Sequence, residues 1–326
     1  MKHLCILLAL GLFSFHRADV SIYGYFWTRY TYENPTTPEV DENDNYFSIE
    51  RGYIRWKTKT TPVSFNGTVD ITSKKDATAS TDWQVRLKYA QADWIIPGTG
   101  KYLPDAKLML GLQKVYFGFV DLWEYPLIEK NLEEAEKKMN SAELGAGFHS
   151  FLPCGYGEFS IQAFNGNGYT NVVEVNANKA LVGNLSVIPL PGVMLKGSYW
   201  MAEQPSGDTI VTQVAQDRYV GLLQLKYGPA TLVGEYLATI DDQTNGLGYM
   251  VFAEFAVTNP VSILGRYDYY DSNTDVDNNG HNRIIGGINW EVSNHLLTQF
   301  NYQLKTYEDE DRDSEDKVMV QFKVSF

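Results

Sequence analysis

The sequence has few of the residues that form disulfide bonds or catalytic centres, with two cysteines and five histidines among 326 residues. Cys5 lies in an N-terminal segment that we expect to be removed, so the exported chain would keep Cys154 alone and form no intramolecular disulfide. The three histidines beyond that segment, His149, His281 and His295, stand in no recognisable nucleophile or metal spacing. The sequence therefore predicts no catalytic residue, no metal site and no cofactor.

Long apolar runs are also missing beyond residue 18. Residues 1–18 begin with a basic Lys2, continue with an apolar run and end at Ala18, which is the layout of a secretory signal peptide. Residues 19–326 then form one domain that contains no stretch long and apolar enough for a transmembrane helix. Export is predicted, and a helical membrane protein is excluded.

Basic residues are fewer than acidic ones: the chain has 27 Lys and Arg and 40 Asp and Glu, which gives a net charge of −13. An acidic chain of this kind is a poor partner for nucleic acid. Aromatic residues, in contrast, make up 14% of the chain. Abundant aromatic residues without long apolar runs are typical of a barrel whose strands meet lipid on one face and water on the other.

Alternation of apolar and polar residues is the main structural signal. Residues 317–326 carry apolar side chains at every even position and end on an aromatic residue, as a membrane-spanning strand does. About sixteen such segments follow one another, of which the eighth, residues 172–188, is expected to be bent. The turns between them alternate between short ones, such as 61–62 and 228–229, and long polar ones. We predict an all-β fold, a transmembrane antiparallel β-barrel of about 16 strands with long outward loops, in the bacterial outer membrane.

A sixteen-stranded barrel is too wide for its side chains to fill, so the interior should be an aqueous channel. The longest connection, residues 116–141, follows the fifth strand and forms the third outward loop. Long loops in compact domains usually have a function. We therefore expect this loop to have a function, and we expect a channel that allows passive diffusion of small anionic or polar solutes.

Several segments resemble the phosphate-selective porin O and P family of bacterial porins. They are residues 111–118 (GLQKVYFG), 163–168 (AFNGNG), 265–271 (GRYDYYD), and 286–290 (GGINW) followed by 299–302 (QFNY). The resemblance spans most of the mature chain. It implies a sixteen-stranded homotrimer with the third loop folded into the pore, and it leaves phosphate selectivity open.

Strand alternation predicts which side chains face the lumen. In the second segment Ile54 and Trp56 should face lipid, while in the fourth segment Val85, Leu87 and Tyr89 should do so. The same rule turns more cations than anions inward, and rings of Lys or Arg favour anions in a narrow pore. The predicted pore-lining cations are Arg51, Arg55, Lys57, Lys59, Arg86, Lys88, Lys107, Lys196, Arg218, Lys226, Arg266 and Arg283.

The third loop carries charges of both signs, and acidic residues outnumber basic ones. It could therefore oppose an acidic loop to a basic wall, and residues 131–140 also have the spacing of a short helix. The predicted constriction-loop residues are Asp121, Glu124, Glu129, Lys130, Glu133, Glu134, Lys137 and Lys138.

The expected partners are the lipid bilayer and lipopolysaccharide. Acidic residues in the last loop could bind divalent cations that bridge lipopolysaccharide, although a solvated loop explains them more simply. A structural or adhesive barrel that does not conduct, and an outer-membrane lipase, are the alternative functions. The sequence contains neither a plug domain nor a nucleophile beside a base, so we do not expect an enzyme.

Overall fold

The computed structural model describes residues 19–34, 44–73, 83–170, 178–206 and 212–326. Sixteen strands account for most of this chain. They are β1 (Asp19–Glu33), β2 (Asp44–Lys59), β3 (Val63–Ser73), β4 (Trp83–Ile95), β5 (Lys107–Lys114), β6 (Ala142–Phe151), β7 (Gly157–Phe164), β8 (Ala180–Leu190), β9 (Val193–Ser206), β10 (Thr212–Tyr227), β11 (Ala230–Asp241), β12 (Thr244–Thr258), β13 (Val261–Asp271), β14 (His281–Ser293), β15 (Leu296–Tyr307) and β16 (Glu315–Ser325). The predicted signal peptide, residues 1–18, lies outside the described residues.

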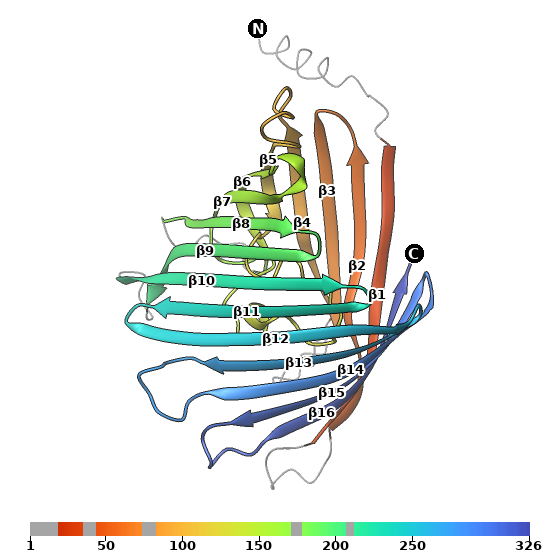
Figure 1. The fold of residues 1–326 in the computed structure, drawn as a ribbon, viewed down its shortest axis with the longest axis vertical. Helices are drawn as coiled ribbons and strands as arrows, with labels where there is room; N and C mark the ends of the chain where they lie inside the picture. Colours follow the sequence, from red (N-terminus) through yellow and green to blue (C-terminus); the bar gives the residue numbers. More distant parts are fainter. Residues whose placement is uncertain (1–18, 35–43, 74–82, 171–177, 207–211) are drawn as a thin grey trace.

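Each strand pairs antiparallel with its neighbours in sequence, and β1 pairs with β16 to close the barrel (Figure 1). Closure leaves no strand edge with unpaired backbone groups, which a bilayer would penalise. Both termini lie at the end of the barrel where the short turns gather. The predicted fold class is confirmed.

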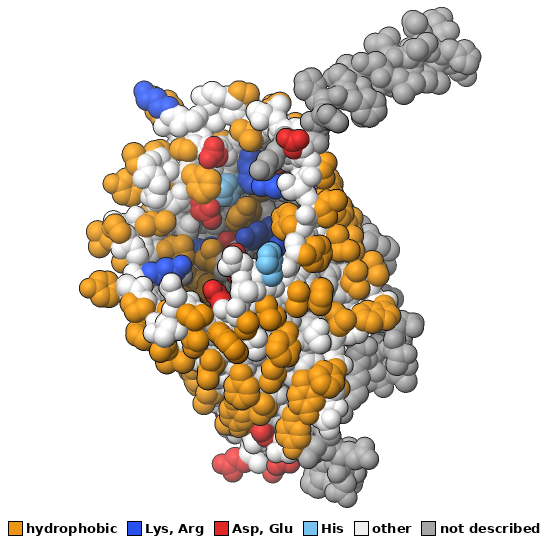
Figure 2. All heavy atoms as spheres, turned by 90° about the vertical axis from the view of Figure 1, so that its right-hand side faces the viewer, with side chains coloured by type: hydrophobic (Ala, Val, Ile, Leu, Met, Phe, Trp, Pro, Cys, Tyr) orange, Lys and Arg blue, Asp and Glu red, His pale blue; other side chains and the backbone are white. Residues whose placement is uncertain are grey.

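The two faces of the wall differ as the alternation predicts. On β16, Phe322 is exposed on the outside, whereas Gln321 is fully buried inside and hydrogen-bonds to Arg29 and Gln299. Exposed apolar side chains continue around the outer surface, which Figure 2 shows as hydrophobic patches on the barrel wall. The outside of the barrel is therefore suited to lipid, in agreement with the predicted outer-membrane location. Among the described residues, no helix is long and apolar enough to cross a membrane.

Two β-bulges change which side chains face inward. Thr68 pairs with Tyr89 and Val69 with Leu87, so Lys88 is an extra residue and both Lys88 and Tyr89 lie inside. The prediction that Tyr89 faces lipid is wrong for this reason, because a bulge shifts the alternation by one residue. A similar shift between β1 and β2 adds Glu50 to the inner face beside Arg51.

Residues 116–141, called L3 below, fold into the barrel as expected. The backbone N–H of Ile128 donates to Asn301 Oδ1 at 2.7 Å, and Asn289 donates to the carbonyl of Pro126 at 2.8 Å. Phe117, Leu127 and Leu132 are fully buried. They pack in one apolar cluster with inward-facing side chains of β7 to β14, including Val220, Leu222, Val233, Leu237, Met250, Phe252, Leu264 and Ile285.

Two expected elements differ in extent from the structure. The helix expected over residues 131–140 is a single turn, α2 (Leu132–Ala135), which Asn131 caps by accepting from the N–H of Glu134. The expected strand over 172–188 begins at Ala180, which pairs with Phe164 at the end of β7. Residues 171–177 lie outside the described residues, while 178 and 179 are not in a strand. The short β7 limits the length over which β8 can pair with it.

Candidate functional site

The apolar side chains of L3 pack against β7 to β14. Two cavities lie between L3 and the opposite wall, which is formed mainly by β2 to β7. The outer cavity has a volume of about 350 Å³ and lies toward the long loops. The inner cavity has a volume of about 540 Å³ and lies toward the short turns, at the end of the barrel that Figure 2 presents.

The two cavities differ in charge. Four cations (Arg51, Arg86, Lys130, Lys137) and three carboxylates (Glu50, Asp70, Glu134) line the outer cavity. Five carboxylates (Asp93, Asp105, Asp121, Glu124, Glu158) and two lysines (Lys107, Lys114) line the inner one, together with His149. The predicted net basic lumen is therefore wrong at the short-turn end, where acidic residues predominate.

The bulge that turns Tyr89 inward also decides the position of Asp93. Strict alternation along β4 would turn Asp93 outward, since Gln84, Arg86 and Lys88 face inward. The bulge at Lys88 reverses the alternation for the rest of the strand, and Asp93 accordingly pairs with Ser64 and contacts Lys107 at 3.3 Å.

Next to the outer cavity, which Arg51 lines, cations lie against aromatic rings. The guanidinium carbon of Arg51 lies 5.4 Å from the ring centroid of Trp27 and 4.7 Å from that of Tyr125. The Arg55 guanidinium lies 5.0 Å from the Tyr25 ring, and Lys323 Nζ lies 4.6 Å from the same ring. We call this cluster the basic-aromatic band; it comprises Tyr25, Trp27, Arg51, Tyr53, Arg55, Lys88, Tyr125, Tyr169 and Lys323.

Tyr53 is the centre of this band. Arg51, Arg55 and Lys88 place their charged groups 5.3, 4.9 and 5.2 Å from its ring centroid. Its hydroxyl accepts a hydrogen bond of 2.7 Å from Lys88 Nζ. Cation–π contacts of this kind stabilise a cation without neutralising it.

Other predicted pore cations have carboxylate partners. Lys196 pairs with Asp121 of L3, and Arg218 pairs with Asp241. Arg283 bridges Glu136 of L3 at 2.8 Å and Asp268 at 3.1 Å. Arg266 forms two hydrogen bonds of 2.7 Å with Asp268 and also donates to the Lys130 carbonyl. These cations fasten L3 or stabilise the wall behind it, and their charge is largely compensated.

The remaining predicted pore cations are more exposed. Arg86 lines the outer cavity, and Lys57 and Lys226 lie near the short-turn ends of β2 and β10. The side chain of Lys59 lies outside the described residues.

The predicted loop residues divide between the wall and the free lumen. Glu129 contacts Lys317 at 3.9 Å, and Lys138 contacts Asp241 at 3.0 Å. Glu134, Lys130 and Lys137 line the outer cavity, while Glu124 lines the inner one. The expected opposition of an acidic loop to a basic wall is thus reduced, because much of the loop's negative charge is directed away from the open side.

Two buried L3 carboxyls have opposite environments. Burial disfavours ionisation of Glu129, but Lys317 and Arg283 outweigh it and lower its pKa to about 2. Burial raises the pKa of Glu133 to about 7. Glu133 is fully buried, accepts from the N–H of Phe119 at 3.0 Å and lies close to Glu235 of β11.

Sequence reasoning did not single out the aromatic part of the band. Alternation was a usable signal for Tyr25 and Trp27, which lie on the same face of β1 as Arg29. For Tyr125 and Tyr169 there was none, because both lie outside the strands and reach the band only through the path of the loops.

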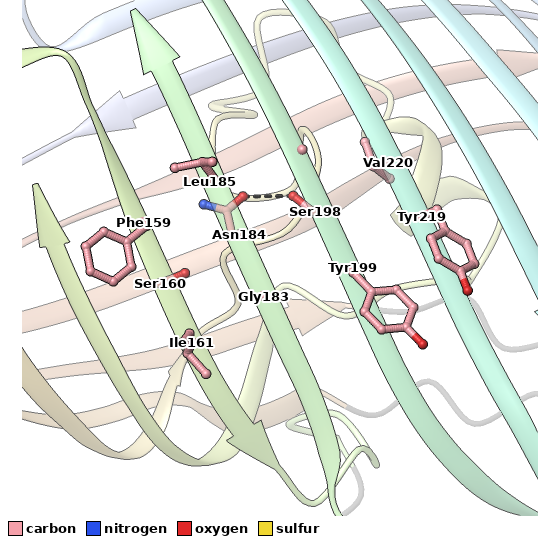
Figure 3. Close-up of a pocket in the computed structure, with 11 residues that line it drawn as sticks. Phe159, Ser160, Ile161, Gly183, Asn184, Leu185, Ser198, Tyr199, Tyr219 and Val220 are labelled. Atoms are coloured by element: carbon pink, nitrogen blue, oxygen red, sulfur yellow. Dashed lines mark hydrogen bonds between the residues drawn. The ribbon is translucent and has the colours of Figure 1, made fainter. Parts of the chain in front are cut away.

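A further apolar groove, with a volume of about 640 Å³, lies on the wall between β7 and β10 (Figure 3). Ile161, Leu185 and Tyr199 are exposed on its outer side, whereas Asn184 and Ser198 are buried and share a hydrogen bond of 2.8 Å. Its apolar lining belongs to the surface expected to meet lipid, so we do not assign it to the solute path.

The histidines form no nucleophile and base pair with their neighbours. His149 Nε2 lies 3.1 Å from Glu158 Oε2, while the adjacent Ser150 hydroxyl donates to the carbonyls of Pro104 and Phe151. Within the described residues, no group of three or more His, Cys, Asp or Glu side chains is arranged to hold a metal ion. Cys154 is exposed in a turn between β6 and β7.

No protein-family model and no curated protein matches the sequence. Solved structures do match the fold. The anion-selective porin from Comamonas acidovorans has a TM-score of 0.68 and 13% identity over 95% of this chain and 100% of that one. OmpF of Salmonella typhi in complex with daunomycin has a TM-score of 0.67 and 13% identity, over 95% and 98%. The trimer form of OmpT of Vibrio cholerae has a TM-score of 0.65 and 8% identity, over 95% and 99%.

Proposed function

We propose that this chain, whose fold is similar to that of bacterial outer-membrane porins, forms a water-filled channel in the outer membrane through which small hydrophilic solutes diffuse passively, and that the channel prefers anions. The proposed path runs from the outer cavity past the basic-aromatic band to the inner cavity. Phosphate, which the sequence resemblance suggests, is one of the anions to test as a permeant.

The proposed anion preference rests on one observation. Among the described residues, no carboxylate lies within 4 Å of the charged groups of Arg51, Arg55 or Lys88. A narrow passage with protein walls of low dielectric constant concentrates the field of such uncompensated charges. Anions are attracted to the basic-aromatic band. The acidic inner cavity reduces the anion preference, but its described carboxylates form no ion pair with these three cations.

The experiment is the zero-current potential across a planar bilayer that contains the purified protein under a salt gradient. The wild type is expected to give the sign of an anion-preferring channel. Arg55→Glu and Lys88→Glu should each shift the potential toward cation preference, because each change replaces a positive charge in the band by a negative one.

Lys101→Glu serves as a matched control, because Lys101 is exposed in the β4 to β5 turn, away from the band. It makes the same change in net charge and should leave the sign and size of the potential nearly unchanged. Conductance with cation preference in the wild type would contradict the anion proposal and keep the channel. Absence of conductance would favour the structural barrel.

We also propose that the chain assembles as a homotrimer, as the family resemblance implies and as a trimer form of a protein of similar fold supports. Analytical ultracentrifugation of the protein in detergent, with the detergent contribution matched by density, would test this. A monomer under conditions that preserve conductance would contradict it.

A further inference from the structure

The basic-aromatic band contains more donors than acceptors. Trp27 and Lys88 are buried, with exposed fractions of 2% and 4%. In the described part of the chain, Trp27 Nε1 and Arg55 Nε are buried without a hydrogen-bond partner. Buried polar groups in proteins are nearly always satisfied, so a set of unsatisfied donors indicates a missing acceptor.

The charges of the band also indicate a missing acceptor. Arg51, Arg55 and Lys88 surround one ring, and their hydrogen bonds go to the hydroxyls of Tyr125, Tyr25 and Tyr53 at 2.8, 3.2 and 2.7 Å. Asp70, which lines the adjoining outer cavity, accepts from Tyr169 at 3.2 Å rather than from these cations. Asp70 and Glu134 attract Arg51 and Lys88 from a distance, but no described carboxylate forms an ion pair with either cation, and burying like charges together without such a pair is costly. An anion bound among them would remove that cost.

The walls of the site restrict which anion fits. Tyr25 and Trp27 stack with a centroid separation of 5.4 Å, and Trp27 meets Tyr125 edge to face at 4.8 Å. A strongly hydrated inorganic anion would lose water against these rings without replacement. A carboxylate attached to a flat apolar group could instead accept from the cations while its ring packs against the tyrosines.

We propose that the basic-aromatic band is a binding site for aromatic monocarboxylates on the solute path. Arg55 supplies Nε and Nη donors to the carboxylate, Lys88 supplies a second cation, and Tyr53 supplies the aromatic surface between them. The inference rests on the proposed channel function and goes beyond a general preference for anions, because it selects by the apolar part of the solute as well as by charge.

The test compares benzoate, acetate and inorganic phosphate as additives. Isothermal titration calorimetry on the wild-type protein in detergent should give a dissociation constant for benzoate at least about tenfold lower than for acetate or phosphate. In planar bilayers, benzoate should reduce chloride conductance over the same concentration range.

Three variants locate the site. Arg55→Gln and Lys88→Gln should each weaken benzoate binding by about tenfold, and Tyr53→Leu should remove the advantage of benzoate over acetate. Arg312→Gln is the matched control, because Arg312 also lies over a tyrosine ring, at 3.4 Å from the Tyr307 centroid, but in the exposed last loop. It should bind benzoate as the wild type does.

The outcomes separate this inference from the proposed function. Equal binding of benzoate and acetate, tighter binding of phosphate, or unchanged benzoate binding in both charge variants would overturn the aromatic carboxylate site. If the zero-current potential still indicates anion preference, the channel proposal survives that result. If the wild type conducts but prefers cations, the anion preference and the aromatic carboxylate site fail together, and only the channel itself stands.

Discussion

The cations inside the barrel form two groups that differ in their surroundings. Those facing L3, such as Lys196 and Arg283, are paired with carboxylates and compensate buried negative charge. Those facing the open side, such as Arg51 and Arg55, contact aromatic rings and tyrosine hydroxyls. Residues of the same type on the same barrel face therefore serve different purposes, the first group in stability and the second in the proposed solute path.

The Lys196 pair gives a prediction about stability. Its partner Asp121 is buried, with a side-chain exposure of 3%, and also accepts from the N–H of Phe117 at 3.0 Å. Lys196→Met should lower the free energy of unfolding by about 3 kcal/mol, because it leaves a buried carboxylate without its cation. Denaturant unfolding in detergent measures the effect. Lys226→Met, on the neighbouring strand and exposed, should cost less than about 0.5 kcal/mol, and equal losses would contradict the argument.

Glu133 gives a prediction about pH. Its folded pKa of about 7 lies above the ordinary value near 4.5, so the folded state binds more protons between these values. Its contribution to stability is therefore largest below about pH 4.5 and is lost as the pH rises through about 7. The wild type should lose stability as the pH rises from about 5 to about 8, because Glu133 ionises in that range. Glu133→Gln should make this loss smaller, by about 2 kcal/mol of unfolding free energy.

Glu310→Gln is the control for this pH profile. Glu310 is exposed in the last loop, away from Glu133, so its substitution should leave the profile close to that of the wild type. Thermal unfolding of both variants in detergent, followed by circular dichroism, gives the comparison. Profiles that coincide for Glu133→Gln and the wild type would rule out this role of Glu133.

At the level of elements, L3 behaves as a fixed partition. Its apolar side chains pack against eight strands, and its backbone is hydrogen-bonded to Asn301, Asn289 and Ser198 of the wall. This packing fills the side of the barrel formed by β7 to β14, and the two cavities lie on the other side. The lumen is consequently narrower than a sixteen-stranded ring alone implies.

The packing of L3 can be tested at Leu127, which is fully buried in the interior. Leu127→Ala should destabilise the protein by about 2 to 4 kcal/mol, because it removes buried methyl groups and leaves a cavity. Loosening L3 should also increase fluctuations of the open-channel current in planar bilayers. Val276→Ala, in an exposed loop, should change neither the stability nor the current fluctuations appreciably. Wild-type stability and wild-type current fluctuations in the Leu127 variant would show that the packing of Leu127 does not hold L3 in place.

For the whole molecule, the important feature is the unequal charge along the barrel. The outer cavity and the band carry an excess of cations, whereas the inner cavity carries an excess of carboxylates. Such an arrangement makes ion accumulation depend on the direction of the applied field. A conducting protein should therefore pass unequal currents at opposite voltages.

This asymmetry should be clear at about 0.1 M salt and weak at about 1 M, where the screening length falls from about 10 to about 3 Å. Current–voltage curves of singly oriented channels measure it. Asp93→Asn combined with Asp105→Asn should reduce the asymmetry at low salt, while Asp275→Asn in an exposed loop should not. Symmetric wild-type curves at low salt would show that the inner carboxylates do not influence the path.

The sequence by itself determined the class of fold, the number of strands and the sorting of turns, whereas the inward path of L3 was implied only by the family resemblance. It also assigned the faces of regular strands correctly, as at Gln321 and Phe322, because a strand has a strict period of two. It could not locate the bulge at Lys88, which depends on the register with β3 and which turned Tyr89 and Asp93 inward.

Only the tertiary structure decided which interior cations are compensated. Arg51 and Arg283 look alike in sequence, since each lies on the inward face of its strand. One meets Tyr125 and the other meets Glu136, two residues of the same loop. That difference arises from how L3 folds across a closed barrel and packs against its wall. Contacts between residues so distant along the chain leave no local pattern, because they form only when the strands have closed.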